Sequence, residues 1–455
     1  MNACPYTNES ATCNLLSPEV AGTTTYCSKC SQFAFQCTEG HWNRAFARYC
    51  TQCSQELKKP AQWDMASGNS QRTATFSVDS VDINLGLNSG VVNTPPIETS
   101  ENLPGMLVID GLFVLPNSKE NRFEACTIVN TENSVRLHHQ WGIDFDTPLT
   151  YGSTPIYHGL HLYSVVSGGI QKTSVIDGKT KLIYDINGVD AAQIEPLSGC
   201  ASLKCKVNGK PTMITGVNRG MLLFDLAKHN GLYINHDFFD KRNEPMSPTL
   251  CGQYVFFTSK HGGIFSLNIG VNPFKRRSPP PQNRSFSAPV SLNGLVYFEA
   301  LNDNGMRSLA CFDPTSGQLS KAADMDSELI QHLEGRRALF THPPLTDGKR
   351  LYLSDRYGHG VYTYDSDKRS YPAKQFQDDT GKHRFIPHQS IVVDNRIYSA
   401  HSSGLTVWEF DRIHHVQTHS LSMGNPTTPT PVARPIQYGD KLFVLCKDRF
   451  ICRDY

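Results

Sequence analysis

The sequence predicts an all-β protein, a β-propeller of eight blades, preceded by a small cysteine-rich module. Two observations carry this prediction. A unit of 42 to 54 residues recurs over the last three quarters of the chain, and seven of the 14 cysteines lie before residue 54. Glycine (34) and proline (27) are frequent while long helical periodicity is scarce, which favours short strands joined by many turns.

The recurring unit begins with a short apolar strand, a tight turn that carries glycine, and a second strand rich in aromatic residues. Examples are "IDGLFVLP" from Ile109 and "LNGLVYFEA" from Leu292. Asp-Gly and Asn-Gly pairs supply the positive φ angles that a two-residue hairpin needs. The turn residues that align the units are Gly111, Gly159, Gly209, Gly252, Gly294, Gly348, Asp394 and Gly439.

Each unit has room for four strands, which is the size of one propeller blade. A single blade cannot cover its own faces, so blades pack radially around an axis. Eight turn residues favour eight blades, and seven blades is the alternative if one turn is misassigned. The last unit ends at Tyr455 after three strands. We expect "RTATFSVDSVDINL" (residues 72–85) to complete it, because such closure removes exposed sheet edges.

These units resemble the PQQ-like, quinoprotein-type β-propeller repeat over about residues 104–455. The resemblance departs from the family in two respects. "DPTSG" from Asp313 is the one nearly intact acidic turn, and only Trp141 and Trp408 stand near positions of the outgoing strand. The tryptophans that interlock blades in quinoprotein dehydrogenases are therefore mostly missing. Prolines at the position where the family has its leading proline are Pro155, Pro248, Pro289, Pro344, Pro387 and Pro435.

The N-terminal cysteines have the spacing of metal ligands. Cys27-x2-Cys30 and Cys50-x2-Cys53 are two knuckles separated by 19 residues, close to a zinc-ribbon arrangement. A single zinc ion held by these four thiolates is one interpretation. It leaves Cys4, Cys13, Cys37 and His41 without a role.

A second interpretation uses all eight groups. "CTEGHWNRAFARYCTQCSQEL" resembles a bacterial zinc-ribbon sequence, although Ser54 stands where the family has glycine. The resemblance implies one site made of Cys37, His41, Cys50 and Cys53. The remaining Cys4, Cys13, Cys27 and Cys30 would then form a second site, and we favour these two structural Zn²⁺ sites over the single one. With about 55 residues and few large apolar side chains, the module depends on metal for its stability.

The domain organisation predicted from these patterns is a zinc-binding module at residues 1–56, a polar linker at 57–71 and the propeller at 72–455. Two segments lie outside the repeat. The basic, proline-rich "FKRRSPPPQNRS" (residues 274–285) is expected to be a solvated connector. Residues 326–340 are expected to form a short helix.

The expected function is that of a non-catalytic adaptor or scaffold. No nucleophile elbow, zinc-protease helix or phosphate loop is present in the sequence, and the resemblance supplies no recognisable cofactor or calcium residues. We therefore expect no enzyme activity, no evident small-molecule substrate and other proteins as partners, through a propeller face and the zinc ribbon. By analogy of architecture, the chain resembles subunits of bacterial signalling or defence assemblies.

Two alternatives stay open. The ribbon could bind nucleic acid, since "HWNRAFARY" interleaves Arg44 and Arg48 with aromatic residues, and the PQQ-like resemblance leaves a quinone-dependent dehydrogenase less favoured. The charge balance of +1 points to no polyanionic partner. A secretion signal is not visible and the longest apolar stretch, about 14 residues, is too short to span a bilayer. These features predict a cytoplasmic protein without a membrane anchor.

Overall fold

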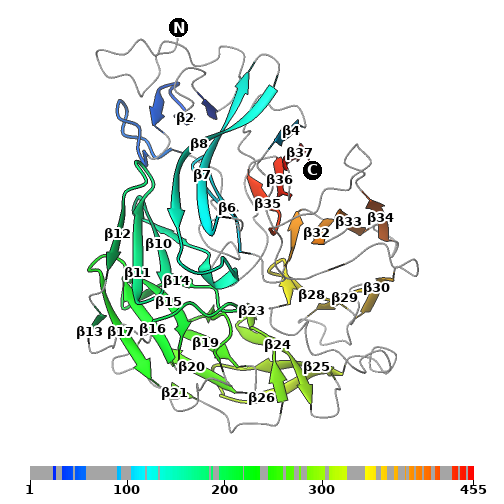
Figure 1. Cartoon of the computed structure of the whole chain (residues 1–455). Coiled ribbons are helices and arrows are strands. Elements are labelled where there is room, and N and C mark those ends of the chain that lie inside the picture. Colours follow the sequence, from blue (N-terminus) through cyan, green and yellow to red (C-terminus); the bar gives the residue numbers. More distant parts are fainter. Residues whose placement is uncertain are drawn as a thin grey trace.

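The chain forms nine small sheets in the part that the computed structural model describes, and eight of them are the blades of a propeller (Figure 1). The predicted all-β propeller fold is thus confirmed, with eight blades and not seven. The residues described are 24–26, 33–44, 47–57, 90–93, 104–117, 120–131, 134–183, 186–187, 194–218, 220–235, 244–259, 263–270, 276–277, 284–302, 307–324, 344–354, 360–365, 373–377, 385, 389–393, 396–401, 404–410, 416–420, 433–438, 441–446 and 449–454.

The first strands of neighbouring blades lie side by side where their contacts are established, in blades 4 to 7. There β18 contacts β23, β23 contacts β27, and β27 contacts β31. The first strands of blades 1 to 8 are β5 (Leu107–Ile109), β9 (Ile156–His158), β14 (Leu203–Val207), β18 (Thr249–Cys251), β23 (Val290–Leu292), β27 (Leu345–Thr346), β31 (Ser390–Val393) and β35 (Ile436–Tyr438).

The aligned turn residues all fall between the first and second strands. Asn208 (φ 49°) and Gly209 (φ 76°) are both left-handed, as a type I′ hairpin requires, and the register there pairs Val207 with Lys210. The repeat seen in the sequence is therefore the repeat of this hairpin. The second strands are β6 (Leu112–Asn117), β10 (His161–Val166), β15 (Lys210–Val217), β19 (Tyr254–Thr258), β24 (Leu295–Asn302), β28 (Arg350–Ser354), β32 (Arg396–His401) and β36 (Lys441–Leu445).

The third strands continue each blade outward in antiparallel order. The longest is in blade 1, where the third and fourth strands form a hairpin of ten and eleven residues. The third strands are β7 (Arg122–Thr131), β11 (Gly169–Ser174), β16 (Gly220–Asp225), β20 (Ile264–Asn268), β25 (Arg307–Phe312), β29 (Gly360–Asp365), β33 (Gly404–Phe410) and β37 (Arg449–Asp454).

The fourth strand of blade 8 comes from the N-terminal part of the chain. It is β4 (Gly90–Asn93), whose residues pair with β37 from Arg449 to Cys452. The closing strand is therefore residues 90–93, whereas residues 72–85, which we expected there, lie outside the described residues. The other fourth strands are β8 (Ser134–Asp144), β12 (Thr180–Ile183), β17 (Asn230–Asn235), β21 (Arg276–Arg277), β26 (Leu319–Asp324), β30 (Ala373–Gln377) and β34 (Val416–Ser420).

The proline-rich segment at residues 274–285 is not only a connector. Its Arg276–Arg277 is the fourth strand β21 of blade 4, and its end lies in β22 (Arg284–Phe286), which pairs with β24 in blade 5. A further strand, β13 (Ile186–Asn187), pairs in parallel with β17. The helix expected at residues 326–340 lies outside the described residues.

One short 3₁₀ helix, η1 (Tyr151–Ser153), precedes the first strand of blade 2. No helix in the described part of the chain has the length and apolar character needed to cross a membrane.

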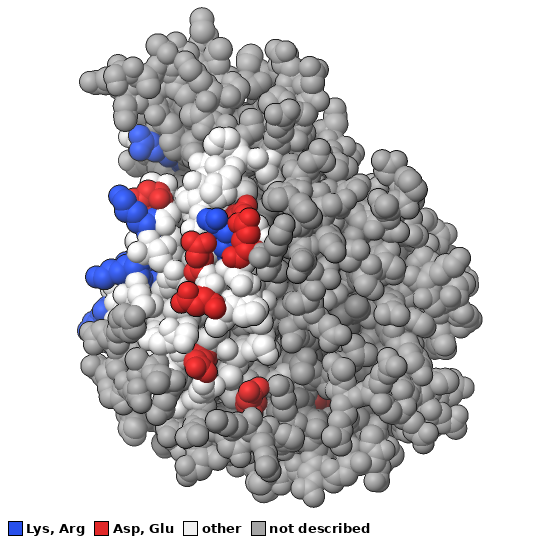
Figure 2. Space-filling model, in the orientation of Figure 1, with Lys and Arg blue, Asp and Glu red and all other residues white. Residues whose placement is uncertain are grey.

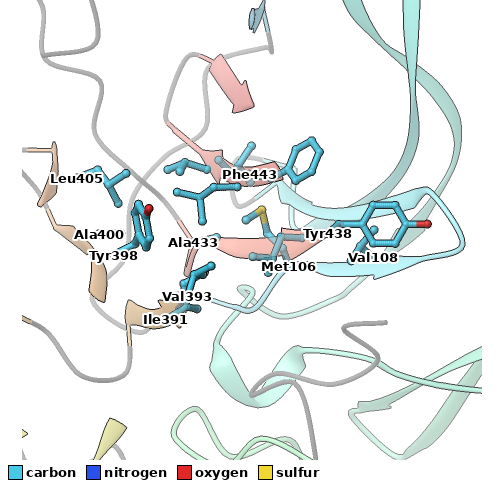
Figure 3. Close-up of a cluster of buried hydrophobic side chains, with 14 of the residues drawn as sticks. Met106, Val108, Ile391, Val393, Tyr398, Ala400, Leu405, Ala433, Tyr438 and Phe443 are labelled. Carbon is cyan, nitrogen blue, oxygen red and sulfur yellow. The ribbon is translucent and has the colours of Figure 1, made fainter. Parts of the chain in front are cut away.

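The hydrophobic core lies between neighbouring blades, since apolar side chains project from both faces of their strands. In blade 1 all six residues of β6 are buried. Figure 3 shows side chains of blades 1, 7 and 8 in one such cluster, with Met106 and Val108 close to Tyr438 and Phe443. Phe113 of β6 contacts Phe443 with 4.7 Å between ring centroids.

Polar contacts also link neighbouring blades. The N–H of Gly105 in blade 1 donates to Thr154 Oγ1 in blade 2 at 2.8 Å, and that of Ala201 in blade 3 donates to Ser247 Oγ in blade 4 at 2.9 Å. Small hydroxyl groups at the start of the first strands thus link adjacent blades.

One tryptophan does interlock two blades. Trp141 lies on the fourth strand β8 and donates its Nε1–H to the carbonyl oxygen of Val175 in blade 2 at 3.2 Å. Trp408, expected near an outgoing strand, lies on the third strand β33, where it is fully buried and contacts Phe385.

Candidate metal centre

Residues 24–57 contain a separate three-stranded sheet, which together with the residues up to Leu57 is called the cysteine module below. The sheet consists of β1 (Thr24–Tyr26), β2 (Phe33–Gln36) and β3 (Trp42–Arg44). Cys37 follows β2 directly. A tight turn through Gly40, whose φ of 81° is left-handed, then brings His41 back beside Cys37.

The second pair of ligands lies in a turn after β3. The backbone N–H of Ser54 donates to the carbonyl oxygen of Cys50 at 2.9 Å, and Ser54 is left-handed with φ 60°. Backbone N–H groups also point at two of the sulfurs, because His41 N–H lies 3.4 Å from Cys37 Sγ and Gln52 N–H lies 3.4 Å from Cys50 Sγ. Such N–H contacts stabilise thiolates.

The side chains of Cys37, His41, Cys50 and Cys53 meet at one point, with all four ligand atoms within 4.8 Å of one another. Cys37 Sγ lies 3.5 Å from His41 Nδ1 and 3.6 Å from Cys53 Sγ. Cys50 Sγ lies 3.7 Å from His41 Nδ1.

These separations are those of a tetrahedral site. Ligands about 2.3 Å (sulfur) and about 2.0 Å (nitrogen) from a central ion stand about 3.5 to 3.8 Å apart at the corners of a tetrahedron. The four residues therefore fit one metal ion, and they supply all four of its ligands.

The electrostatics of the cluster favour a bound cation. Burial raises the pKa of Cys50, but hydrogen bonds from the backbone N–H groups of Cys53 and Gln52 outweigh it and lower that pKa to about 6. The N–H of Gln55 lowers the pKa of Cys53, yet burial and the neighbouring Cys50 and Cys37 raise it to about 11. Several thiolates side by side repel one another, and a metal ion removes that repulsion.

Another residue of the motif, Asn43, holds the module together by hydrogen bonds. Asn43 is 1% exposed, donates its amide N–H to the carbonyl oxygen of His41 at 2.9 Å and accepts the N–H of Thr51 at 2.9 Å. It ties the strand that carries His41 to the turn that carries Cys50 and Cys53. Arg44, Arg48 and Tyr49 are exposed.

Of the eight predicted ligands, the structure brings together Cys37, His41, Cys50 and Cys53. In the described residues, Cys50 and Cys53 thus share a site with Cys37 and His41. The predicted ligands Cys4, Cys13, Cys27 and Cys30 lie outside the described residues. Cysteines of the propeller that are buried, as expected for small hydrophobic residues, are Cys126, Cys200, Cys205, Cys251, Cys311 and Cys446.

The cysteine module packs against the propeller, a contact that the sequence did not predict. Phe35, Cys37, Cys50 and Leu57 are buried in the same hydrophobic cluster as residues of blades 1, 6, 7 and 8. Leu137 of β8 also packs against this cluster. Leu57, the first residue of the predicted linker, is fixed by its N–H, which donates to Arg48 O at 2.9 Å.

Comparison with known proteins gives the fold and no closer relationship. No protein-family model matches this chain, and no curated protein matches its sequence. The structure of the computationally designed Ika8 protein matches with a TM-score of 0.54 and 11% identity, over 80% of this chain and 100% of that one. Quinohemoprotein alcohol dehydrogenase from Comamonas testosteroni matches with a TM-score of 0.50 and 10% identity, over 86% of this chain and 80% of the enzyme.

BamB from Moraxella catarrhalis matches with a TM-score of 0.48 and 12% identity, over 80% of this chain and 97% of BamB. The matches to Ika8 and to the quinohemoprotein enzyme, with TM-scores of 0.50 or more, establish the architecture, and identities this low do not establish an activity. The chain therefore has the fold of the quinoprotein-type β-propellers, with a Cys₃His cluster before the propeller that fits one metal ion.

Proposed function

We propose that this protein is a non-catalytic adaptor that binds other proteins through a face of the propeller and through the cysteine module. The observation that carries the proposal is the hydrophobic cluster that the module shares with blades 1, 6, 7 and 8. Because of this contact, the module and the ring present their outer surfaces in a fixed relation. Two surfaces held in this way suit a scaffold that contacts one partner at two places or two partners at once.

The metal of the centre is proposed to be Zn²⁺ with a structural role. Three thiolates and one imidazole in a tetrahedron are the ligands and geometry that zinc prefers in structural sites. Four protein ligands leave no open position for water or substrate, and catalytic zinc sites keep one. A second zinc site made of Cys4, Cys13, Cys27 and Cys30 stays a prediction, as does the cytoplasmic location.

Two measurements test the metal. Native mass spectrometry of protein purified without added zinc should show at least one tightly bound zinc ion, and two if the predicted second site exists. The double variant Cys37→Ser/Cys53→Ser should lose the ion held by the described cluster, while a Cys446→Ser variant in the propeller should keep it. A Cys37→Ser/Cys53→Ser variant that retains its full zinc content would contradict the assignment.

The adaptor role is tested by quantitative affinity purification of the tagged protein from its native host, at low and high salt. We expect one or a few proteins at near-stoichiometric levels, reduced in the Cys37→Ser/Cys53→Ser variant and retained in Cys446→Ser. Co-purification of a quinone cofactor together with dye-linked oxidation of an alcohol would instead establish a dehydrogenase.

Nucleic-acid binding through the cysteine module is a second candidate, favoured by one observation. Tyr49 is 50% exposed, and the guanidinium of Arg48 lies 5.3 Å from the centre of its ring. An exposed aromatic ring beside arginine can stack on a base. Against it, Arg48 is already paired with Glu56 at 3.2 Å.

Fluorescence anisotropy with single-stranded DNA and RNA at two salt concentrations separates the candidates. Tight, salt-sensitive binding that the Arg44→Ala/Arg48→Ala variant abolishes would favour the nucleic-acid function. Weak binding that this variant does not change would leave the adaptor proposal in place.

A further inference from the structure

Blades 2 and 3 meet along a seam that ends in basic side chains. It contains His161, Tyr163, Lys172 and Lys181 of blade 2 and His229 of blade 3, and this group is called the basic seam below. Tyr163, Lys172 and Lys181 lie opposite one another on β10, β11 and β12. His161 is two residues from Tyr163 and so lies on the same face of the blade.

Two close contacts cross the seam between blades 2 and 3. His229 Nε2 lies 3.1 Å from Lys172 Nζ and 3.2 Å from the hydroxyl oxygen of Tyr163. The Tyr163 hydroxyl donates its hydrogen to Leu226 O at 3.2 Å. An ammonium group can only donate, so Nε2 of His229 accepts from Lys172 and the imidazole is neutral in this arrangement.

Apolar side chains lie beside the seam on the same strands. Val165, Ile170 and Ile183 of blade 2 pair with one another two residues along the strands from Tyr163, Lys172 and Lys181, and they are buried in one hydrophobic cluster with residues of blade 3. Lys172 and His229 are half-buried, and Lys181 is exposed. The basic groups therefore stand where the buried contact between the two blades gives way to the surface.

The positive charge of the seam is poorly compensated within the described residues. Two lysines directly opposite on neighbouring strands repel each other. Burial first and Lys181 second lower the pKa of Lys172. Burial, then Lys172, His161 and Lys181, lower the pKa of His229, and only Asp225 acts in the other direction.

Among the described residues, two carboxylates of blades 2 and 3 are engaged by other groups. Asp225 Oδ1 accepts the backbone N–H groups of Ala227 and Lys228, each at 2.9 Å. Asp177 pairs with Lys179 at 2.8 Å and not with Lys181. Figure 2 shows Lys and Arg side chains along the left edge of the view, where Figure 1 draws β10 to β12, while acidic side chains gather nearer the middle of that face.

We propose that the basic seam binds a phosphate monoester dianion. The two ammonium groups of Lys172 and Lys181 match its two negative charges, and its oxygens offer strong acceptors for them. A bound dianion accepts from Lys172 in place of His229, and His229 then gains a proton on Nε2 and donates as well. A phosphodiester, with one negative charge, would leave one of the lysines uncompensated.

The ligand could be a free phosphate ester or a phosphorylated side chain of another protein, because the recognised group is the same. Isothermal titration calorimetry of the full-length, metal-loaded protein distinguishes them. The probes are inorganic phosphate, O-phosphoserine and a short phosphoserine peptide at constant ionic strength. Tighter binding of the peptide than of inorganic phosphate identifies a phosphorylated side chain, and the reverse order identifies a free phosphate, and either result supports the proposal.

Three variants locate the binding. Lys172→Gln should weaken phosphate binding at least about tenfold and His229→Gln at least about threefold. The control Lys349→Gln, an exposed lysine in the β27–β28 turn of blade 6, should change it by less than about twofold. Binding by the wild type should also take up protons, seen as heats that differ between buffers of different ionisation enthalpy.

Thermal unfolding shows that a loss of binding is not a loss of folding. Without phosphate, Lys172→Gln should melt at or above the wild-type temperature, because the repulsion with Lys181 is gone. Phosphate should raise the melting temperature of the wild type and not of Lys172→Gln. The proposal fails if Lys172→Gln and His229→Gln bind phosphate as the wild type does. It also fails if a single-stranded oligonucleotide without terminal phosphate binds the seam more tightly than phosphoserine.

Discussion

Ser54 adopts a backbone conformation that L-residues rarely take. Its φ of 60° lies in the left-handed region, directly after the ligand Cys53. Glycine adopts this conformation without the steric cost of about 1 to 2 kcal/mol that a side chain incurs. The turn that presents Cys50 and Cys53 is therefore slightly strained, because serine stands at a position where the zinc-ribbon motif has glycine.

Replacing Ser54 tests this strain. Ser54→Gly should stabilise the metal-bound module by about 0.5 kcal/mol, because the relief of strain exceeds the added entropy of the unfolded chain. Ser54→Val should destabilise it by more than about 1 kcal/mol, since a branched side chain tolerates positive φ poorly. Competition with a chromogenic zinc chelator measures both. Equal zinc retention by the two variants would show that the turn carries no strain.

The metal ligands could be predicted from the sequence because they are close in the chain. Cys37, His41, Cys50 and Cys53 span 17 residues, and the resemblance of this stretch to a zinc ribbon implied the set, whereas the CxxC spacing alone left Cys37 and His41 without a role. The basic seam could not be predicted in this way. Lys172 and His229 are 57 residues apart and belong to different repeats, so their contact depends on how two blades pack.

The contact between Trp141 and blade 2 joins the same two blades as the hydrogen bond from Gly105 to Thr154. The β11–β12 turn leaves no room beside the indole. A Cβ atom added at Gly178 would lie 2.4 Å from Cβ of Trp141, and Gly178 is left-handed with φ 69°. The turn therefore needs glycine for two separate reasons, its backbone conformation and the close approach of the ring.

Two glycine variants separate these reasons. Gly178→Ala should lower the free energy of unfolding by more than about 2 kcal/mol, because strain and steric overlap add. Gly252→Ala is the matched control, since Gly252 is also left-handed (φ 58°) but has no atom within 4 Å of the added Cβ. Gly252→Ala should lower the free energy of unfolding by only about 1 kcal/mol.

Denaturant unfolding followed by tryptophan fluorescence measures both changes. If the two alanine variants lose the same stability, the contact between Trp141 and the turn adds nothing to the cost of placing alanine in the left-handed backbone conformation.

The inner strands of the blades were predictable and the outer ones were less so. Glycine and asparagine or aspartate mark the first hairpin because only certain residues tolerate its φ angles. The outer strands form by main-chain pairing and do not require particular residue types. Arg276–Arg277 is a strand despite its two charges, and Gly90–Asn93 closes the ring with four residues, too few for a clear alternating pattern.

At the scale of the whole molecule, β4 decides whether the ring is closed. Removal of residues 1–93 would expose the edge of β37, and removal of residues 1–57 would leave that edge paired. Unpaired edges promote association between copies. We expect the shorter deletion to remain monomeric, with somewhat lower stability because Phe35 and Leu57 leave the shared cluster. The longer deletion should form oligomers or aggregates.

Size-exclusion chromatography with light scattering distinguishes the two deletions. A synthetic peptide containing residues 88–95 should partly restore the monomer of the longer deletion by pairing with β37. Identical behaviour of both deletions would argue against closure by β4.

Metal removal should destabilise the cysteine module and leave most of the propeller folded. Structural zinc sites supply about 10 kcal/mol of folding free energy in small modules. After treatment with a strong chelator, hydrogen exchange should accelerate in β2 and β3 and at the Leu137 end of β8, where the module packs. The second strands of blades 3 to 6 should keep their protection. Uniform loss of protection would mean that the two parts fold as a single unit.

The pairing of β4 with β37 also has a consequence for biosynthesis. Residues that emerge early from the ribosome must wait for the last strand to be made before the ring can close. At about 5 to 20 residues per second, that delay lasts tens of seconds. Throughout it, the cysteine module has already been synthesised, whereas blade 1 still lacks the neighbour that covers one of its faces.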